Sequence, residues 1–115
     1  MVEHAAGAYL PKKGKSIFLN FLMQISPNCD CYPHNDLPIV KDIGMVGASD
    51  PVAIDTASCD LVNGEESIPG SAIKHPSPKG EDKFRVVFPR IDWNIQLDHA
   101  RWLNMGERVY TLVKV

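Results

Sequence analysis

Two cysteines one residue apart are the residues in this sequence best suited to chemistry. Cys29 and Cys31 flank Asp30, and His34 and Asp36 follow in the same stretch. Residues i and i+2 of an extended chain point to the same side, so both sulfurs could reach one ion. Thiolates bind zinc at about 2.3 Å, and zinc or iron sites also recruit imidazole and carboxylate ligands. The pattern therefore predicts a metal-binding or redox-linked site, with zinc or iron, at this Cys-Asp-Cys loop.

Further ligands for such a site can be named from the sequence. Cys59 could join from a helix, which would give three sulfurs and one nitrogen, and Asp30 could orient the shell. The alternative is that the cysteines are thiols on a surface loop and that His34 and Asp36 are turn residues. Three cysteines are too few for an all-cysteine four-iron cluster, so this chain alone does not support a complete one.

Asp50 and Asp55 form a second constellation, at the start of a predicted helix. Asp50 can accept hydrogen bonds from the first helix N–H groups, and Pro51 has a φ suited to the first helical position. A helix N-terminus also attracts anions, so both aspartates are candidate cofactor-binding residues, and Asp55 is a candidate acid or base. Capping alone would explain Asp50, and a solvated helix face would explain Asp55. The sequence leaves open whether the protein is an enzyme.

Alternating helices and strands must position these residues. The segment 26–42 is rich in Pro, Asn and Asp, as a long functional loop would be, and 83–88 could be a strand or a helical turn. The alternation of helices and strands predicts one α/β or α+β domain over 1–115, with two to three helices and a small mixed sheet of about three strands. Apolar periodicity and turn residues predict helices over 2–9, 51–62 and from Asp92 to Gly106, and strands over 16–25, 43–48 and 109–115. The strand 16–25 is expected to be buried, and a helix is the alternative there because a continuous apolar run has no diagnostic period.

Composition limits the class of protein. The 115 residues are 44% apolar and 23% charged, as in an ordinary soluble domain, and the net charge of −2 argues against nucleic-acid binding. The sequence shows neither an apolar run of about 20 residues for a membrane span nor a secretory leader, so the cytoplasm is the expected location. A sheet of three strands gives a thin core with open edges. We therefore expect a second copy or a partner chain, and a structural or interaction module is the alternative function.

The order of the motifs resembles that of a known family. The motifs are an apolar strand, Cys-Asp-Cys at 29–31, Asp-Ile-Gly at 42–44, the run Ser49 to Asp55, and the closing segment 93–115. This order is similar to that of a domain-of-unknown-function family described as uncharacterised iron–sulfur centre proteins.

The resemblance implies that 1–115 corresponds to the C-terminal portion of a longer protein. It also implies that the site region contains Cys29, Cys31, Asp50 and Asp55. Many family members carry a ferredoxin-like insertion with two runs of cysteines, and this chain contains no C-x-x-C-x-x-C spacing. The iron–sulfur label of the family therefore does not transfer directly to this chain.

Overall fold

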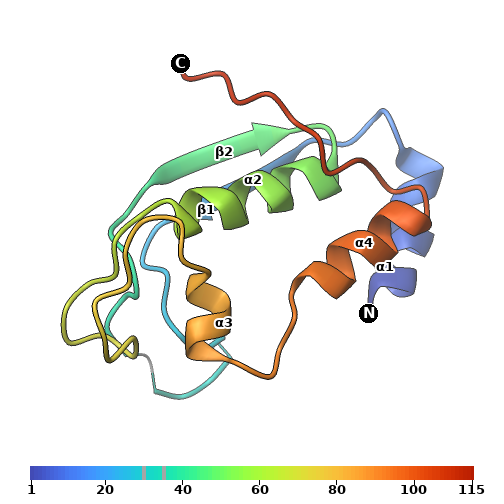
Figure 1. Cartoon of the computed structure of the whole chain (residues 1–115). Helices are drawn as coiled ribbons and strands as arrows, with labels where there is room; N and C mark the ends of the chain where they lie inside the picture. The colour runs from blue at the N-terminus through green and yellow to red at the C-terminus, as the bar shows by residue number, and fades with distance from the viewer. Residues whose placement is uncertain (30, 35) are drawn as a thin grey trace. The chain divides into compact units, whose positions relative to one another are not determined.

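The computed structural model describes residues 1–29, 31–34 and 36–115. Mixed helices and strands confirm the predicted class. The described residues form four α-helices where two to three were expected, because residues 83–87 of the ambiguous segment 83–88 are helical. The elements within the described residues are α1 (Val2–Tyr9), the 3₁₀ helix η1 (Leu10–Lys12), β1 (Phe18–Leu22), β2 (Gly44–Ala48), α2 (Pro51–Asn63), α3 (Lys83–Val87) and α4 (Asn94–Trp102) (Figure 1).

β1 and β2 form an antiparallel two-stranded sheet, the only sheet in the described residues. The backbone N–H of Ile43 donates to the carbonyl oxygen of Leu22 at 2.8 Å, and Gly47 lies against Phe18 and Leu19. Side chains of β1 alternate between a more buried and an exposed set. The apolar run is therefore half-buried rather than buried on both faces, as a short strand with one covered face should be.

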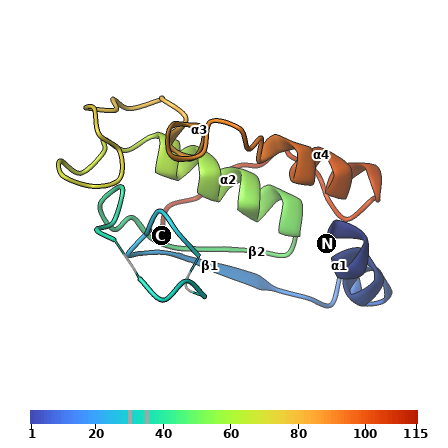
Figure 2. The same cartoon turned by 90° about the horizontal axis from the view of Figure 1, so that it is seen from below.

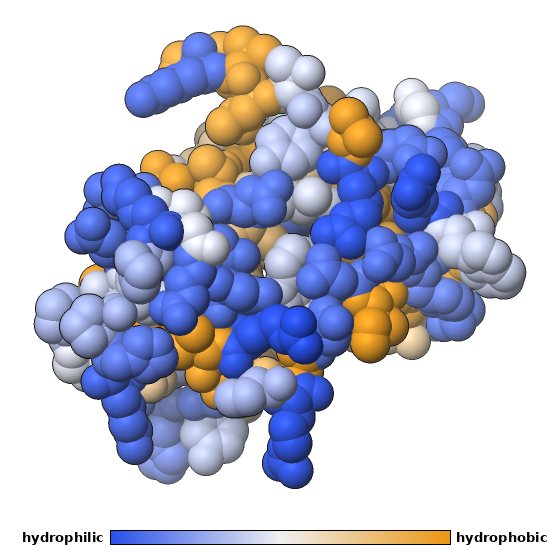
Figure 3. All heavy atoms as spheres, viewed as in Figure 1, coloured by the Kyte–Doolittle hydropathy of each residue, from blue (hydrophilic) through white to orange (hydrophobic). Residues whose placement is uncertain are grey.

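The prediction of a third strand over 109–115 is wrong. No strand is assigned to this segment in the described part of the chain, and Val109 and Val113 are 87% and 73% exposed. Figure 3 shows hydrophobic spheres gathered along it at the top of the view. Its β-branched composition favours a strand, but a strand also needs a neighbour whose backbone groups pair with its own. The expected sheet of about three strands is accordingly a sheet of two.

α4 is shorter than the predicted helix from Asp92 to Gly106. Its N-cap residue is Trp93 rather than Asp92, and it ends at Trp102. Asn104 has a φ of 59° and reverses the chain direction where a glycine was expected to do so. The prediction that Gly106 ends the helix is therefore wrong.

The chain divides into two compact units, and each is described by itself below. The prediction of a single domain over 1–115 stays a prediction. Unit 1 comprises residues 1–20, 46–58 and 93–115, and unit 2 comprises residues 21–45 and 59–92.

The core of unit 1 forms around α1 and α4, which lie side by side in both views (Figures 1 and 2). His99 of α4 hydrogen-bonds Glu3 of α1 at 2.7 Å, and the Tyr9 ring meets Phe18 edge-on at 5.4 Å. Apolar side chains of both helices and of α2 are removed from water here, which supplies most of the stabilisation of such a unit. The buried residues of this cluster are Ala6, Tyr9, Val52, Ala100 and Met105, and Ile54, Ala57 and Leu97 of the same unit are also buried.

The core of unit 2 contains a lysine. Lys83 is fully buried, and its Nζ donates to the carbonyl oxygens of Asn63, Pro78 and Glu81 at 3.1, 2.6 and 3.0 Å. This ammonium group therefore connects the end of α2, the following loop and the start of α3. Burial lowers the pKa of Lys83, against the opposing charge of the nearby acidic groups. One cluster of buried apolar residues in unit 2 consists of Ile39, Val40, Val62 and Ile73, and Leu22 is also buried.

Candidate functional site

Cys29 and Cys31 lie in an exposed turn of unit 2. The backbone N–H of Tyr32 donates to the carbonyl oxygen of Cys29 at 2.8 Å and closes the turn. The pKa of the Cys31 thiol is raised, mainly by a hydrogen bond with the Cys29 side chain and then by the negative charge that Cys29 can carry. The two thiols therefore lie close enough for one to influence the ionisation of the other.

The other residues of the loop make local contacts. The His34 ring meets the Tyr32 ring edge-on at 6.1 Å. Asp36 Oδ1 accepts from the backbone N–H of Leu37 at 3.1 Å, as aspartate commonly does in turns. Asp30 lies outside the described residues. His34 and Asp36 thus have the contacts expected of turn residues. These contacts do not test whether either residue binds a metal ion, so that role stays a prediction.

The donor set fits part of a metal shell. Two interacting sulfurs match half of a tetrahedral zinc site. Within 1–29, 31–34 and 36–115, no three His, Cys, Asp or Glu side chains are grouped so that they could hold an ion. Cys59 lies half-buried on α2. Ligation by Cys29, Cys31, Cys59, His34 or Asp36 stays a prediction, and Cys29 and Cys31 are the two of these residues that lie on one closed turn.

Asp50 caps α2 and also holds the chain after α4. Its Oδ1 accepts from the N–H groups of Val52 and Ala53 at 2.8 and 2.9 Å, and its Oδ2 accepts from the N–H of Glu107 at 2.9 Å. Gly106 lies so close to the carboxylate that a Cβ atom there would overlap it. The carboxylate itself occupies the helix N-terminus and would repel an anionic ligand. This geometry favours capping over ligand binding for Asp50.

Asp55 has a different environment, which includes a residue that the sequence did not suggest. Its Oδ1 accepts from Asn20 Nδ2 at 2.9 Å, and the same amide nitrogen donates to Ser58 Oγ at 3.0 Å. Asp55 lines two cavities of unit 1, of about 270 and 470 Å³. Asn20 is the polar residue within the apolar run of β1. That interruption on the more buried side of the strand is the signal that could have identified it.

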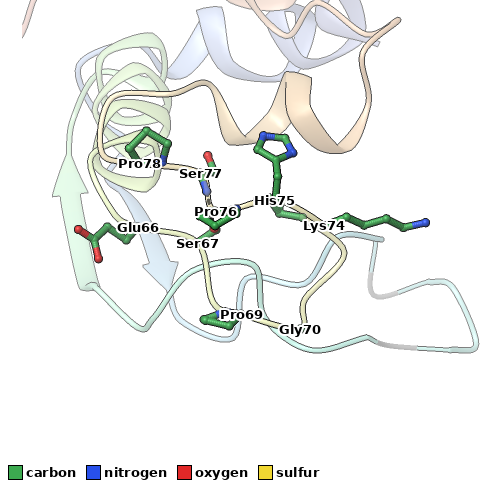
Figure 4. A pocket seen from close by; sticks show the side chains of 10 residues that line it. Glu66, Ser67, Pro69, Gly70, Lys74, His75, Pro76, Ser77 and Pro78 are labelled. Carbon is green, nitrogen blue, oxygen red and sulfur yellow. Dashed lines mark hydrogen bonds between the residues drawn. The ribbon is translucent and has the colours of Figure 1, made fainter.

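A further cavity of about 680 Å³ lies in the loop 66–78 of unit 2 (Figure 4). The side chains of Glu66 and Lys74 point to opposite sides of the loop. The pKa of Glu81 is lowered by the nearby Ser77 hydroxyl and then by the charge of His75, whose Nε2 lies 3.6 Å from Glu81 Oε2. The charged groups therefore stabilise the loop or face solvent and do not converge on this cavity.

These features define a small mixed α/β protein with an exposed dithiol. Residues 1–60, just over half of the chain, match the family described as a domain of unknown function (DUF362), and the chain belongs to this family. No curated protein and no solved structure matches the chain. The matched part contains Cys29, Cys31, Asp50 and Asp55. No helix of the described residues is both long enough and apolar enough to cross a bilayer.

Proposed function

We propose that the protein binds a thiophilic metal ion, zinc or ferrous iron, through the thiolates of Cys29 and Cys31. The observation that carries this proposal is the turn, closed by the Tyr32 N–H, which holds the two thiols close enough to influence each other's ionisation. Two groups held on one closed turn lose little conformational freedom when both bind the same ion.

The pair would supply two of the ligands. Binding requires both thiols in the thiolate form, so it releases protons, and the charge of the ion offsets the repulsion between two adjacent thiolates. Exposure of the turn leaves room for further ligands. We propose that His34, Asp36 or Cys59, a second copy of the chain, or solvent provides them.

Zinc titration of anaerobically reduced protein tests the proposal. We expect saturable binding that weakens at least about tenfold in Cys29→Ser and in Cys31→Ser, because each removes a thiolate ligand. Cys59→Ser removes one thiol and leaves the pair intact, so it reports whether Cys59 supplies a further ligand. His34→Ala and Asp36→Ala then report whether either side chain completes the shell. Equal zinc affinity in the wild type and in both pair variants would refute the proposal.

A further inference from the structure

The larger of the two cavities beside Asp55 has the properties of a small-molecule site. Its volume of about 470 Å³ falls within the roughly 300–1,000 Å³ typical of ligand pockets. Tyr9, Ile54 and Met105, which line it, are 9%, 2% and 6% exposed and belong to the buried interior. The wall is therefore formed by packed side chains and needs no ligand to take shape.

The polar atoms that Asp55 and Asn20 leave available to a ligand in this cavity are hydrogen-bond acceptors. Both hydrogens of Asn20 Nδ2 are used, one toward Asp55 Oδ1 and one toward Ser58 Oγ. Within the described residues, Asp55 Oδ2 and Asn20 Oδ1 accept no hydrogen bond from the protein. Each has lone pairs available for a donor. Ser16 and Tyr9 also line the cavity and have polar side chains. The Ser16 hydroxyl donates to the carbonyl oxygen of Lys12 at 3.2 Å.

The charge of the lining selects a cation. Asp55 is the charged residue among those that form this wall, and it is half-buried. A carboxylate beside apolar surface favours a charged donor through a short, charge-assisted hydrogen bond and repels an anion. Tyr9 and Phe18 also belong to this wall and pack edge-on against each other at 5.4 Å, so aromatic surface is available to the apolar part of a ligand. A Ca²⁺ ion would require six to eight oxygen ligands, far more than this wall offers.

We propose that this cavity binds a small organic amine, with the ammonium group between Asp55 and Asn20 and the apolar body against the surrounding wall. The neighbouring cavity of about 270 Å³ also includes Asp55 and extends along α4 past Leu97 and Ala100. The apolar part of the ligand thus has space on either side of the carboxylate. Both cavities are formed within unit 1, so the proposal does not depend on the cysteine site of unit 2.

Benzylamine, benzyl alcohol and benzoate are matched probes of this proposal, to be titrated into the full chain and followed by nitrogen–proton NMR. We expect saturable shifts of the Asn20 side-chain amide with benzylamine, binding at least about tenfold weaker with benzyl alcohol, and no saturation with benzoate. This comparison changes only the charge of the probe and uses the wild-type protein, so it remains valid even if a variant folds poorly.

The variant Asp55→Asn keeps an oxygen to accept from Asn20 and removes the charge. We expect it to weaken benzylamine binding at least about tenfold, to the level of benzyl alcohol. Asp60→Asn, the same change on the exposed part of α2, should leave binding unchanged. Absence of saturable binding, equal binding of benzoate, or full binding by Asp55→Asn would each overturn the proposal. The Cys29→Ser variant is expected to bind benzylamine normally, which separates this test from that of the cysteine site.

Discussion

Replacement of Asp50 by alanine is expected to lower the free energy of unfolding by about 3 kcal/mol. The carboxylate accepts from two N–H groups at the start of α2 and from the N–H of Glu107. Loss of an N-cap side chain costs about 1 kcal/mol, and an N–H left without an acceptor adds about 1–3 kcal/mol. Urea denaturation followed by circular dichroism measures the change. Asp50→Asn keeps one acceptor oxygen for the cap, so it should lose about half as much.

Gly106→Ala tests the same contact from the other side. The added Cβ would overlap the Asp50 carboxylate, so the backbone must shift, at a cost of about 1–3 kcal/mol. In the Asp50→Ala background the obstacle is gone, and the same alanine should cost much less. Strong non-additivity in this double-mutant cycle is the expected result. Additive losses from Asp50→Ala and Gly106→Ala would contradict the inferred contact.

Lys83→Met is expected to destabilise the protein by about 3 kcal/mol. The methionine fills a similar volume but removes the charged donor from the carbonyl oxygens of Asn63, Pro78 and Glu81, of which the first two keep only a backbone N–H donor. The effect is measured by denaturant unfolding at neutral pH. Lys79→Met, at an exposed position of the same loop, is the control and should change stability by less than about 0.5 kcal/mol. A fully stable Lys83→Met protein would mean that the buried ammonium is not needed.

The pH dependence of this site follows from the direction of the pKa shift. Burial lowers the pKa of Lys83 from 10.5, so between the two values the unfolded chain binds more protons than the folded one. The destabilising cost of a buried charge is present below the folded-state pKa and decreases as the pH rises toward 10.5. The difference in stability between wild type and Lys83→Met should therefore grow with pH in this window. A difference that shrinks there would contradict the shift.

Local signals explain which elements could be predicted. α2 follows from Asp50-Pro51 at its start and Asn63-Gly64 at its end, since capping depends on neighbours in the sequence. The strands β1 and β2 follow from short apolar runs. The segment 109–115 is also a short, mainly apolar run, but it has no strand neighbour in the described chain. Strand pairing depends on residues far away in the sequence, which local composition does not reveal.

The contacts of the candidate sites likewise divide into local ones, which the sequence suggests, and long-range ones, which it does not. The interaction of Cys29 with Cys31 is local, so the spacing of the two residues was sufficient to suggest it. The contact of Gly106 with Asp50 joins distant parts of the sequence, and nothing in the type of either residue indicates it. The burial of Lys83 was equally hidden, because lysine is rarely buried and its carbonyl partners come from the backbone.

X-ray absorption spectroscopy of the zinc-loaded protein tests most directly whether Cys29 and Cys31 share one ion. We predict at least two sulfur ligands per zinc, at the distance of about 2.3 Å usual for thiolates. The Cys31→Ser protein should show fewer sulfur ligands or lose the ion. A zinc shell composed only of nitrogen and oxygen in the wild type would contradict the proposed function.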